Sequence, residues 1–357
     1  MWLRHDVIQH RRKMINRTII RTRALQIAYA YQHREMAPIR AIVEALELSL
    51  KETYEFYLHF LGLLSDLTDL HCELLEARKH KHLATKEDKN PDMRLANNSL
   101  AVRMRQSPIL QEYASSAVVN WRSNDSLLRR LLNKLLASDA YRNYLSAEPS
   151  IEADTTFWAE VYRDLIFCDE DVAEELEAYS PFWDNPLQIT EKYGCEEMPD
   201  IETIDEAVEE LKAQGNYRYV RADTVPVEIA KDFVLKTIRK MKDNEGPDSG
   251  ISPMYKDPSD RQFAIDLISL TIENGQDYRQ KLQSYLINWD GERVADIDML
   301  IMQMAMVEIS EMDEIPAHIS INEYIELAKS YSTPKSYAFI NGVLDKLAQQ
   351  MAKKKSR

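Results

Sequence analysis

The chain has 357 residues, enough for one to three domains with sizeable apolar cores. Asp and Glu outnumber Lys and Arg by 59 to 45, which gives a formal net charge of −14. This balance excludes a protein that coats nucleic acid or an anionic membrane with its whole surface, but it permits a local basic patch. Gly is scarce, with 8 residues, and apolar residues recur at helical spacing, so we expect an all-α protein.

The cysteines and the apolar runs indicate the cellular compartment of the protein. Cys72, Cys168 and Cys195 are far apart and form no CxxC pair, so we expect no disulfide framework and no thiolate zinc site. No apolar run approaches the roughly 20 residues that a spanning helix needs. Residues 1–13 are charged and lack the apolar segment of a signal peptide. These features predict a cytoplasmic protein.

The first predicted helix covers residues 17–34, with Asn16 as its N-cap. Arg17, Arg21 and Arg23 lie on its opening turns, where no acid accompanies them. Cations at a helix N-terminus oppose the helix dipole, and Arg17 and Arg21 also repel each other, at a cost of no more than roughly 1 kcal/mol. These arginines are either tolerated surface charges or a cluster that contacts phosphate groups, since the guanidinium fork suits phosphate oxygens. The sequence leaves open whether translation starts at Met1 or at Met14, which would make residues 1–13 an N-terminal extension.

The middle of the chain reads as further helices joined by polar loops. We expect one or two long amphipathic helices after Pro38, a polar loop near residues 83–98, and a helix capped by Ser126. Acidic helices follow at residues 169–179 and 204–214. Residues 242–260 are rich in Gly and Pro and form the best candidate linker.

The carboxyl-terminal part shows a tighter helical pattern. Apolar positions predict one long helix over residues 263–285 and a central, buried helix over residues 299–309. The sequence "SINE", Ser320 to Glu323, reads as a capping box that opens the next helix. Thr333 and Pro334 read as the N-cap and first position of the last helix.

The chain contains no recognisable catalytic or cofactor motif. It has no GxxxxGK[ST], GxGxxG, HExxH or GxSxG sequence. The histidines of "HKH", His80 to His82, suit a solvated helix end better than a metal site. Asp296 and Asp298 would point in different directions on a helix and make a poor catalytic pair. We therefore expect a protein that is not an enzyme and that needs neither cofactor nor metal.

Two segments resemble the NusB family of transcription antitermination factors. The segment "EIPAHISINEYIELAKSYSTPKSYAFINGVLDKLA", residues 314–348, is similar to the family signature of an [IV]P, then INE-x-[IV]-ELAK, then F-[IV]-NG-[IV]-LDK. The segment "NRTIIRTRALQIAY", residues 16–29, resembles its arginine-containing first helix. The intervening residues have no counterpart in short NusB proteins and resemble the extended middle of a long-insert branch.

The resemblance implies a division of the chain and a function. It implies a helical bundle core interrupted by a large helical insertion, in the following segments: an N-terminal extension 1–13, a first core helix 14–35, the insertion 36–257, the rest of the core 258–350 and a basic tail 351–357. It also implies binding to boxA-type RNA of ribosomal transcripts, together with NusE, a small-subunit ribosomal protein, in an RNA polymerase antitermination complex.

The resemblance also assigns site residues. It implies RNA contacts for Arg17, Arg21, Arg23, Tyr331, Lys335 and Phe339. Lys335 stands where several short NusB proteins carry an acid, so no role specific to a carboxylate is transferred to it. Asp298 falls on an acidic position linked in the family to the NusE contact.

A second function class remains open from the sequence. The acidic insertion could make the chain a protein–protein scaffold for basic partners, with RNA binding reduced or lost. An RNA-methyltransferase fusion is disfavoured, because the insertion is Gly-poor and lacks a cofactor-binding glycine loop.

Overall fold

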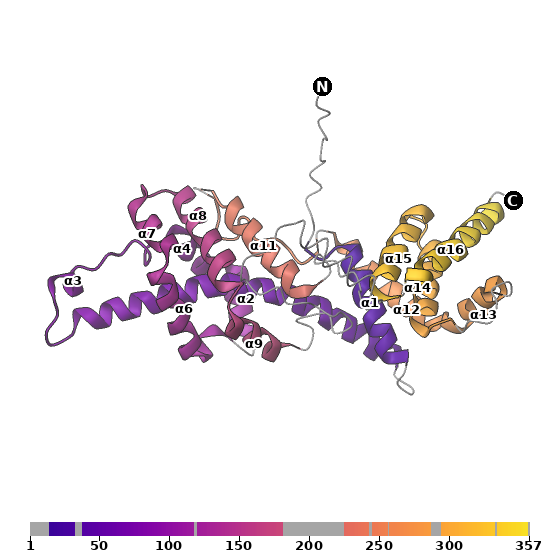
Figure 1. Ribbon diagram of the computed structural model, residues 1–357, viewed down its shortest axis with the longest axis horizontal. Coiled ribbons are helices and arrows are strands. Elements are labelled where there is room, and N and C mark those ends of the chain that lie inside the picture. The colour runs from indigo at the N-terminus through magenta and orange to yellow at the C-terminus, as the bar shows by residue number, and fades with distance from the viewer. Residues whose placement is uncertain are drawn as a thin grey trace, which may run out of the picture.

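The computed structural model describes residues 14–32, 38–117, 120–180, 225–242, 245–255, 257–286, 294–332 and 334–355. Within these ranges the chain is helical and forms no strand, which confirms the all-α prediction. Figure 1 shows an elongated molecule, with the carboxyl-terminal helices at one end and most of the insertion at the other.

A single long helix connects the two ends of the molecule. Helix α2, Ile39–Lys79, has 41 residues and therefore spans about 60 Å. Its first half contacts α1, Arg17–Gln32, and α12, Pro258–Glu273, whereas its second half carries the helices of the insertion (Figure 1). Helix α11, Pro226–Lys240, packs along it. The expected long amphipathic helices after Pro38 are thus one continuous element.

The remaining elements of the insertion are short. In chain order they are α3 Lys86–Lys89, α4 Ser99–Gln106, α5 Pro108–Ser116, the 3₁₀ helix η1 Trp121–Ser123, α6 Asp125–Ala137, α7 Asp139–Ser146, α8 Ile151–Val161, the π-helical turn η2 Tyr162–Ile166, and α9 Glu170–Tyr179. The acidic helix expected at residues 204–214 lies outside the described residues.

Side-chain caps fix several helix starts. Asn16 accepts a hydrogen bond from the Ile19 backbone N–H at 2.9 Å, as predicted. The cap of α6 is Asn124 and not Ser126, because Asn124 Oδ1 accepts from the Leu127 N–H at 3.2 Å. Asp169 caps α9 by accepting from the Val172 N–H.

The predicted linker is packed against α2. The Ser252 N–H donates to the Tyr57 hydroxyl at 3.0 Å, and the Met254 carbonyl accepts from the Ile15 N–H at 3.2 Å. Gly250 has φ +87°, a conformation that strains other residues. This segment therefore fastens the beginning of α1 to the insertion.

The carboxyl-terminal helices confirm one expectation and correct two. They are α12, α13 Gly275–Leu286, α14 Asp296–Glu311, α15 Ala317–Tyr331 and α16 Pro334–Lys355. Helix α14 is central and buried along nearly its whole length, as predicted. The long helix expected over residues 263–285 is instead broken at Asn274. Helix α15 begins at Ala317, so "SINE" lies inside it and forms no capping box.

The cysteines correct a further expectation. Cys72 is a free thiol, but Cys168 is disulfide-bonded, so the prediction of a chain without disulfides is wrong at that residue. Among the described residues, no helix has the length and apolar character needed to cross a lipid bilayer.

His59 of α2 lies in an aromatic cluster that joins α2 to α5 and η1. Its ring stacks on Trp121 with centroids 4.2 Å apart, and its Nδ1 lies 3.1 Å from the Tyr113 hydroxyl. The side chain is 2% exposed, and burial lowers the pKa of His59 to about 3. The folded state thus holds a neutral imidazole that the unfolded chain protonates near pH 6.5.

This burial predicts a pH-dependent stability. Because the folded-state pKa is depressed, the contribution of His59 is complete above about pH 6.5 and is lost as the pH falls toward 3. Between pH 6.5 and 5 we expect a loss of about 2 kcal/mol in the free energy of unfolding. His59→Phe keeps a ring against Trp121 and should remove this contribution to the pH dependence of the free energy of unfolding. Urea unfolding at pH 7.5, 6 and 5 measures that dependence. Equal slopes for the variant and the wild type would contradict this.

Candidate functional site

Arg21 of α1 forms a buried ion pair with Glu308 of α14. Its Nη2 donates to Glu308 Oε1 at 2.6 Å, and its Nε donates to Glu308 Oε2 at 2.8 Å. The two side chains are 4% and 0% exposed. The Arg21 guanidinium therefore binds a carboxylate of its own chain and is not exposed to solvent.

Other donors complete the shell around Glu308. Ser320 Oγ donates to it at 2.7 Å, and the Tyr324 hydroxyl donates at 3.1 Å. Glu323 adds a second acid, which pairs with Arg21 at 3.3 Å. We call these five residues the Glu308 cluster; it joins α1, α14 and α15.

The charges of the cluster shift its pKa values. Burial alone lowers the pKa of Arg21, but the hydrogen bonds and negative charge of Glu308 outweigh it, so that the net pKa is raised. Burial and the charge of Glu308 together raise the pKa of Tyr324 well above its usual range. Arg21 is therefore fixed in its charged form, and Tyr324 remains a neutral donor.

Arg17 lies one turn earlier on α1 and reaches the surface. Its side chain is 28% exposed, and its Nε lies 3.3 Å from Oδ1 of the buried Asp260. The guanidinium also lies over the Phe263 ring, 4.7 Å from the centroid. Arg17 thus has one acidic partner and one aromatic partner, and its side chain remains partly exposed to solvent.

A buried series of hydrogen bonds starts from the middle of α1. Arg23 Nη1 donates to Gln26 Oε1 at 2.7 Å, and Gln26 Nε2 donates to the Tyr331 hydroxyl at 2.8 Å. Arg23 is 1% exposed and Tyr331 is 3% exposed. These contacts fix the end of α15 against α1, next to the turn that leads into α16.

The remaining predicted residues surround that turn. Asp298, 4% exposed, accepts a hydrogen bond from the hydroxyl of Ser332, the residue that ends α15. Lys335 lies in the first turn of α16, and its side chain lies outside the described structure. Phe339 is half-buried against the core.

The structure thus separates the predicted site residues into buried ones and ones that reach the surface. Expecting Arg21 and Arg23 on the surface was wrong, because both guanidinium groups are buried. Tyr331 offers no exposed ring face, since its side chain is packed between helices. Arg17 lies at the first turn of α1, whereas Lys335 follows the end of α15, which contacts α1 at Gln26.

The acids of the Glu308 cluster are what sequence reasoning missed. Glu323 reads as a surface residue, yet it accepts from Thr18 Oγ1 at 2.8 Å and pairs with Arg21. The available signal was Glu308, a carboxylate within the nearly apolar stretch "MLIMQMAMVEI". A buried carboxylate requires a counter-charge, and the arginines of the first helix were the cations without a local acid.

Comparison with known sequences identifies the relatives of this chain. A sequence model described as the NusB family matches residues 227–349. A transcription antitermination protein NusB from Salinibacter ruber is 34% identical over 122 residues, which cover 32% of this chain and 76% of that relative. The chain belongs to the NusB family.

Further NusB proteins agree over similar lengths. The protein from Clostridium perfringens is 32% identical over 125 residues, or 35% of this chain and 87% of the relative. The one from Chloroherpeton thalassium is 40% identical over 98 residues, but this covers 27% of the chain and only 46% of the relative. No solved structure matches the chain.

The NusB match begins before the expected boundary at residue 258. The match begins at residue 227 and therefore includes α11, which packs along α2. Helices α2 to α9 precede the matched residues. The division into residues 14–35, 36–257 and 258–350 stays a prediction.

The Glu308 cluster yields a stability prediction. Arg21→Met should lower the free energy of unfolding by about 3–5 kcal/mol, because Glu308 is left as a buried charge without its counter-ion. Arg21→Met combined with Glu308→Gln should cost less than the sum of the single changes. Chemical denaturation measures this, with Arg142→Met as the control, since the Arg142 side chain is 63% exposed in its ion pair. A cost for Arg21→Met no greater than for the control would contradict it.

Proposed function

We propose that this chain is a non-catalytic transcription antitermination factor. In this proposal it binds boxA-type RNA of ribosomal transcripts together with NusE, as part of an RNA polymerase complex in the cytoplasm. The observation that carries the proposal is the NusB family match over residues 227–349. That range holds the motif-bearing helices α15 and α16.

The proposed RNA contact uses Arg17, Lys335 and Phe339 in place of the buried arginines. Arg17 offers part of its guanidinium to solvent, and arginine suits both phosphate oxygens and base faces. Lys335 stands at the start of α16, where a helix N-terminus favours phosphate. Phe339, half-buried on the same helix, offers an aromatic face for a base, a contact worth about 1–3 kcal/mol when it forms.

The buried members of the predicted site then act as positioning residues. Arg21 fixes α1 on α14 through Glu308. Arg23 and Tyr331 connect α1 to the end of α15 through Gln26. Asp298 holds Ser332 at the turn before α16, so we assign its effect on NusE binding to the position of that turn.

A scaffold function is the competing proposal, and α9 is the feature that favours it. This helix exposes a row of acids suited to a basic protein partner: Glu170, Asp171, Glu174 and Glu177. A pure scaffold predicts no specific boxA affinity, so RNA binding separates the two functions.

The RNA function predicts a defined loss on changing Lys335. Lys335→Ala should weaken boxA RNA binding about 3- to 10-fold near 0.1 M salt and lower the slope of log K against log salt by about 0.7, the value for one lost phosphate contact. Fluorescence anisotropy with labelled boxA RNA, with and without NusE, measures both quantities. Arg142→Gln, an exposed arginine on α7, is the control. Unchanged affinity and slope for Lys335→Ala would contradict the assigned contact.

A further inference from the structure

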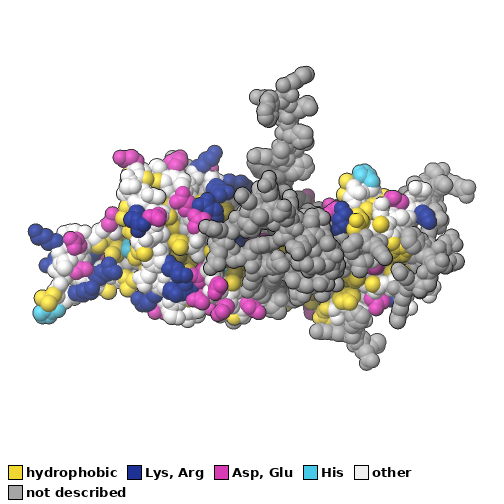
Figure 2. All heavy atoms as spheres, viewed as in Figure 1, with side chains coloured by type: hydrophobic (Ala, Val, Ile, Leu, Met, Phe, Trp, Pro, Cys, Tyr) yellow, Lys and Arg dark blue, Asp and Glu magenta, His cyan; other side chains and the backbone are white. Residues whose placement is uncertain are grey.

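A cationic surface lies on the insertion, at the end of α11. Arg239 and Lys240 lie in the last turn of α11, Lys242 follows it, and Arg103 of α4 donates to the Lys242 carbonyl. No acid partner is found for any of these four cations among the described residues. We call them the α11 cationic end. Figure 2 shows Lys and Arg side chains gathered over the upper end of α11, beside α8.

Several other arginines of the described insertion lie in ion pairs. Arg105, Arg122 and Arg130, for example, each pair with carboxylates. In a chain of net charge −14, acids are plentiful, so cations gathered without acid partners are unexpected. The α11 cationic end therefore places positive charge on the surface of an acidic chain.

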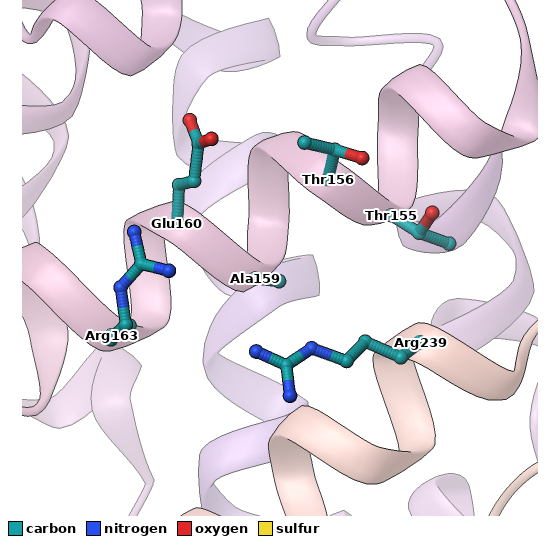
Figure 3. Close-up of a pocket in the computed structure, with 6 residues that line it drawn as sticks. All are labelled: Thr155, Thr156, Ala159, Glu160, Arg163 and Arg239. Carbon is teal, nitrogen blue, oxygen red and sulfur yellow. The ribbon is translucent and has the colours of Figure 1, made fainter. Parts of the chain in front are cut away.

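A cavity adjoins Arg239. It has a volume of about 220 Å³, lies between α8, η2 and α11, and is lined by Thr155, Thr156, Ala159, Glu160, Arg163 and Arg239 (Figure 3). Ala159 is the only apolar side chain in this lining. A polar cavity with arginines at its edge suits a phosphate group better than an apolar side chain.

The direction of Arg239 supports this reading. A cation in the last turn of a helix is favoured by the helix dipole, and Lys240 satisfies that preference equally well. The dipole does not explain why the Arg239 side chain extends across the cavity toward α8, as Figure 3 shows. The guanidinium instead faces the wall that carries Arg163.

Arg163 is presented by the π-helical turn η2. Tyr162 anchors that turn, because it is fully buried and its hydroxyl donates to the Phe60 carbonyl. Arg163 itself is exposed and forms an ion pair with its neighbour Asp164, whose side chain is 56% exposed, and the Glu160 charge also acts on it. Exposed ion pairs of this kind contribute little, so a phosphate can compete for Arg163. The Glu160 carboxylate points away from Arg239 (Figure 3).

Arg103 of α4 contacts the chain at the end of α11. Its Nη2 donates to the Lys242 carbonyl at 2.7 Å, which fixes the chain just beyond α11. Its Nη1 is buried without a hydrogen-bond partner among the described residues. The contact with the Lys242 carbonyl keeps the charge of Arg103 beside the end of α11.

We propose that the α11 cationic end binds the phosphate backbone of the RNA beyond the boxA segment. This inference rests on the proposed function. It extends the RNA path from the carboxyl-terminal helices onto the insertion, along α2, which contacts both α11 and α1. Contacts to phosphate position the RNA and read no sequence, so the flanking nucleotides need no defined sequence.

The test compares two RNAs and two matched variants. One RNA is labelled boxA RNA alone, and the other carries polyuridine flanks at both ends. Arg239→Gln combined with Lys240→Gln removes two cations of the α11 cationic end. The control, Lys231→Gln combined with Lys236→Gln, removes two cations of the same helix that are paired with Glu228 and Asp232.

We expect the wild type to bind the flanked RNA about 10-fold tighter than boxA alone. The Arg239/Lys240 variant should lose this gain and lower the salt slope for the flanked RNA by about 1.4, two phosphate contacts on a single strand. Its affinity for boxA alone, and both affinities of the control, should stay unchanged.

Several results would overturn the inference. They are no gain from the flanks in the wild type, an equal loss in the control, or a loss of boxA affinity in the Arg239/Lys240 variant. If boxA alone binds and the flanks add nothing, this inference fails and the proposed function stands. If neither RNA binds the wild type, the proposed function fails and this inference fails with it.

Discussion

The buried contact between Arg21 and Glu308 is the constraint on which the arrangement of the core depends. Glu308 lies on the nearly apolar helix α14 and is completely buried, where an unpaired carboxylate would be very costly. Arg21 supplies the counter-charge from 287 residues away. Because the fork of Arg21 engages both carboxylate oxygens, α1 is held on α14 in a defined orientation, and Ser320 and Tyr324 bring α15 to the same carboxylate.

This constraint separates two roles of the first-helix arginines: pairing with a buried carboxylate and contacting phosphate. An arginine whose donors are taken up by a buried carboxylate cannot also present them to phosphate. The RNA contact that we propose therefore falls to Arg17, to the start of α16 and, beyond the core, to the end of α11. Like the buried chain from Arg23 to Tyr331, the Glu308 cluster acts as the support that fixes where those groups lie.

Local signals predicted much of the fold. The cap at Asn16, the buried character of α14 and the start of α16 at Pro334 follow from neighbouring residues alone, and the motif over residues 314–348 predicted the family. Long-range pairing could not be read in the same way. The sequence shows that Arg21 lacks a local acid, but only the fold brings Glu308 to it. The Glu308 carboxylate also accepts a hydrogen bond from the Ser320 hydroxyl, which a capping box at "SINE" would have used as its cap. The orientation of Arg239 across a cavity likewise depends on how α8 packs against α11.

The most direct test of this account is the hydrogen exchange of the Arg21 Nε–H, measured by NMR on isotopically labelled protein with and without boxA RNA. We predict slow exchange in the free protein, since this N–H donates to a fully buried carboxylate, and an unchanged rate and chemical shift when RNA binds. Exchange as fast as that of the exposed Arg142, together with a shift of the Arg21 signal on adding RNA, would contradict it.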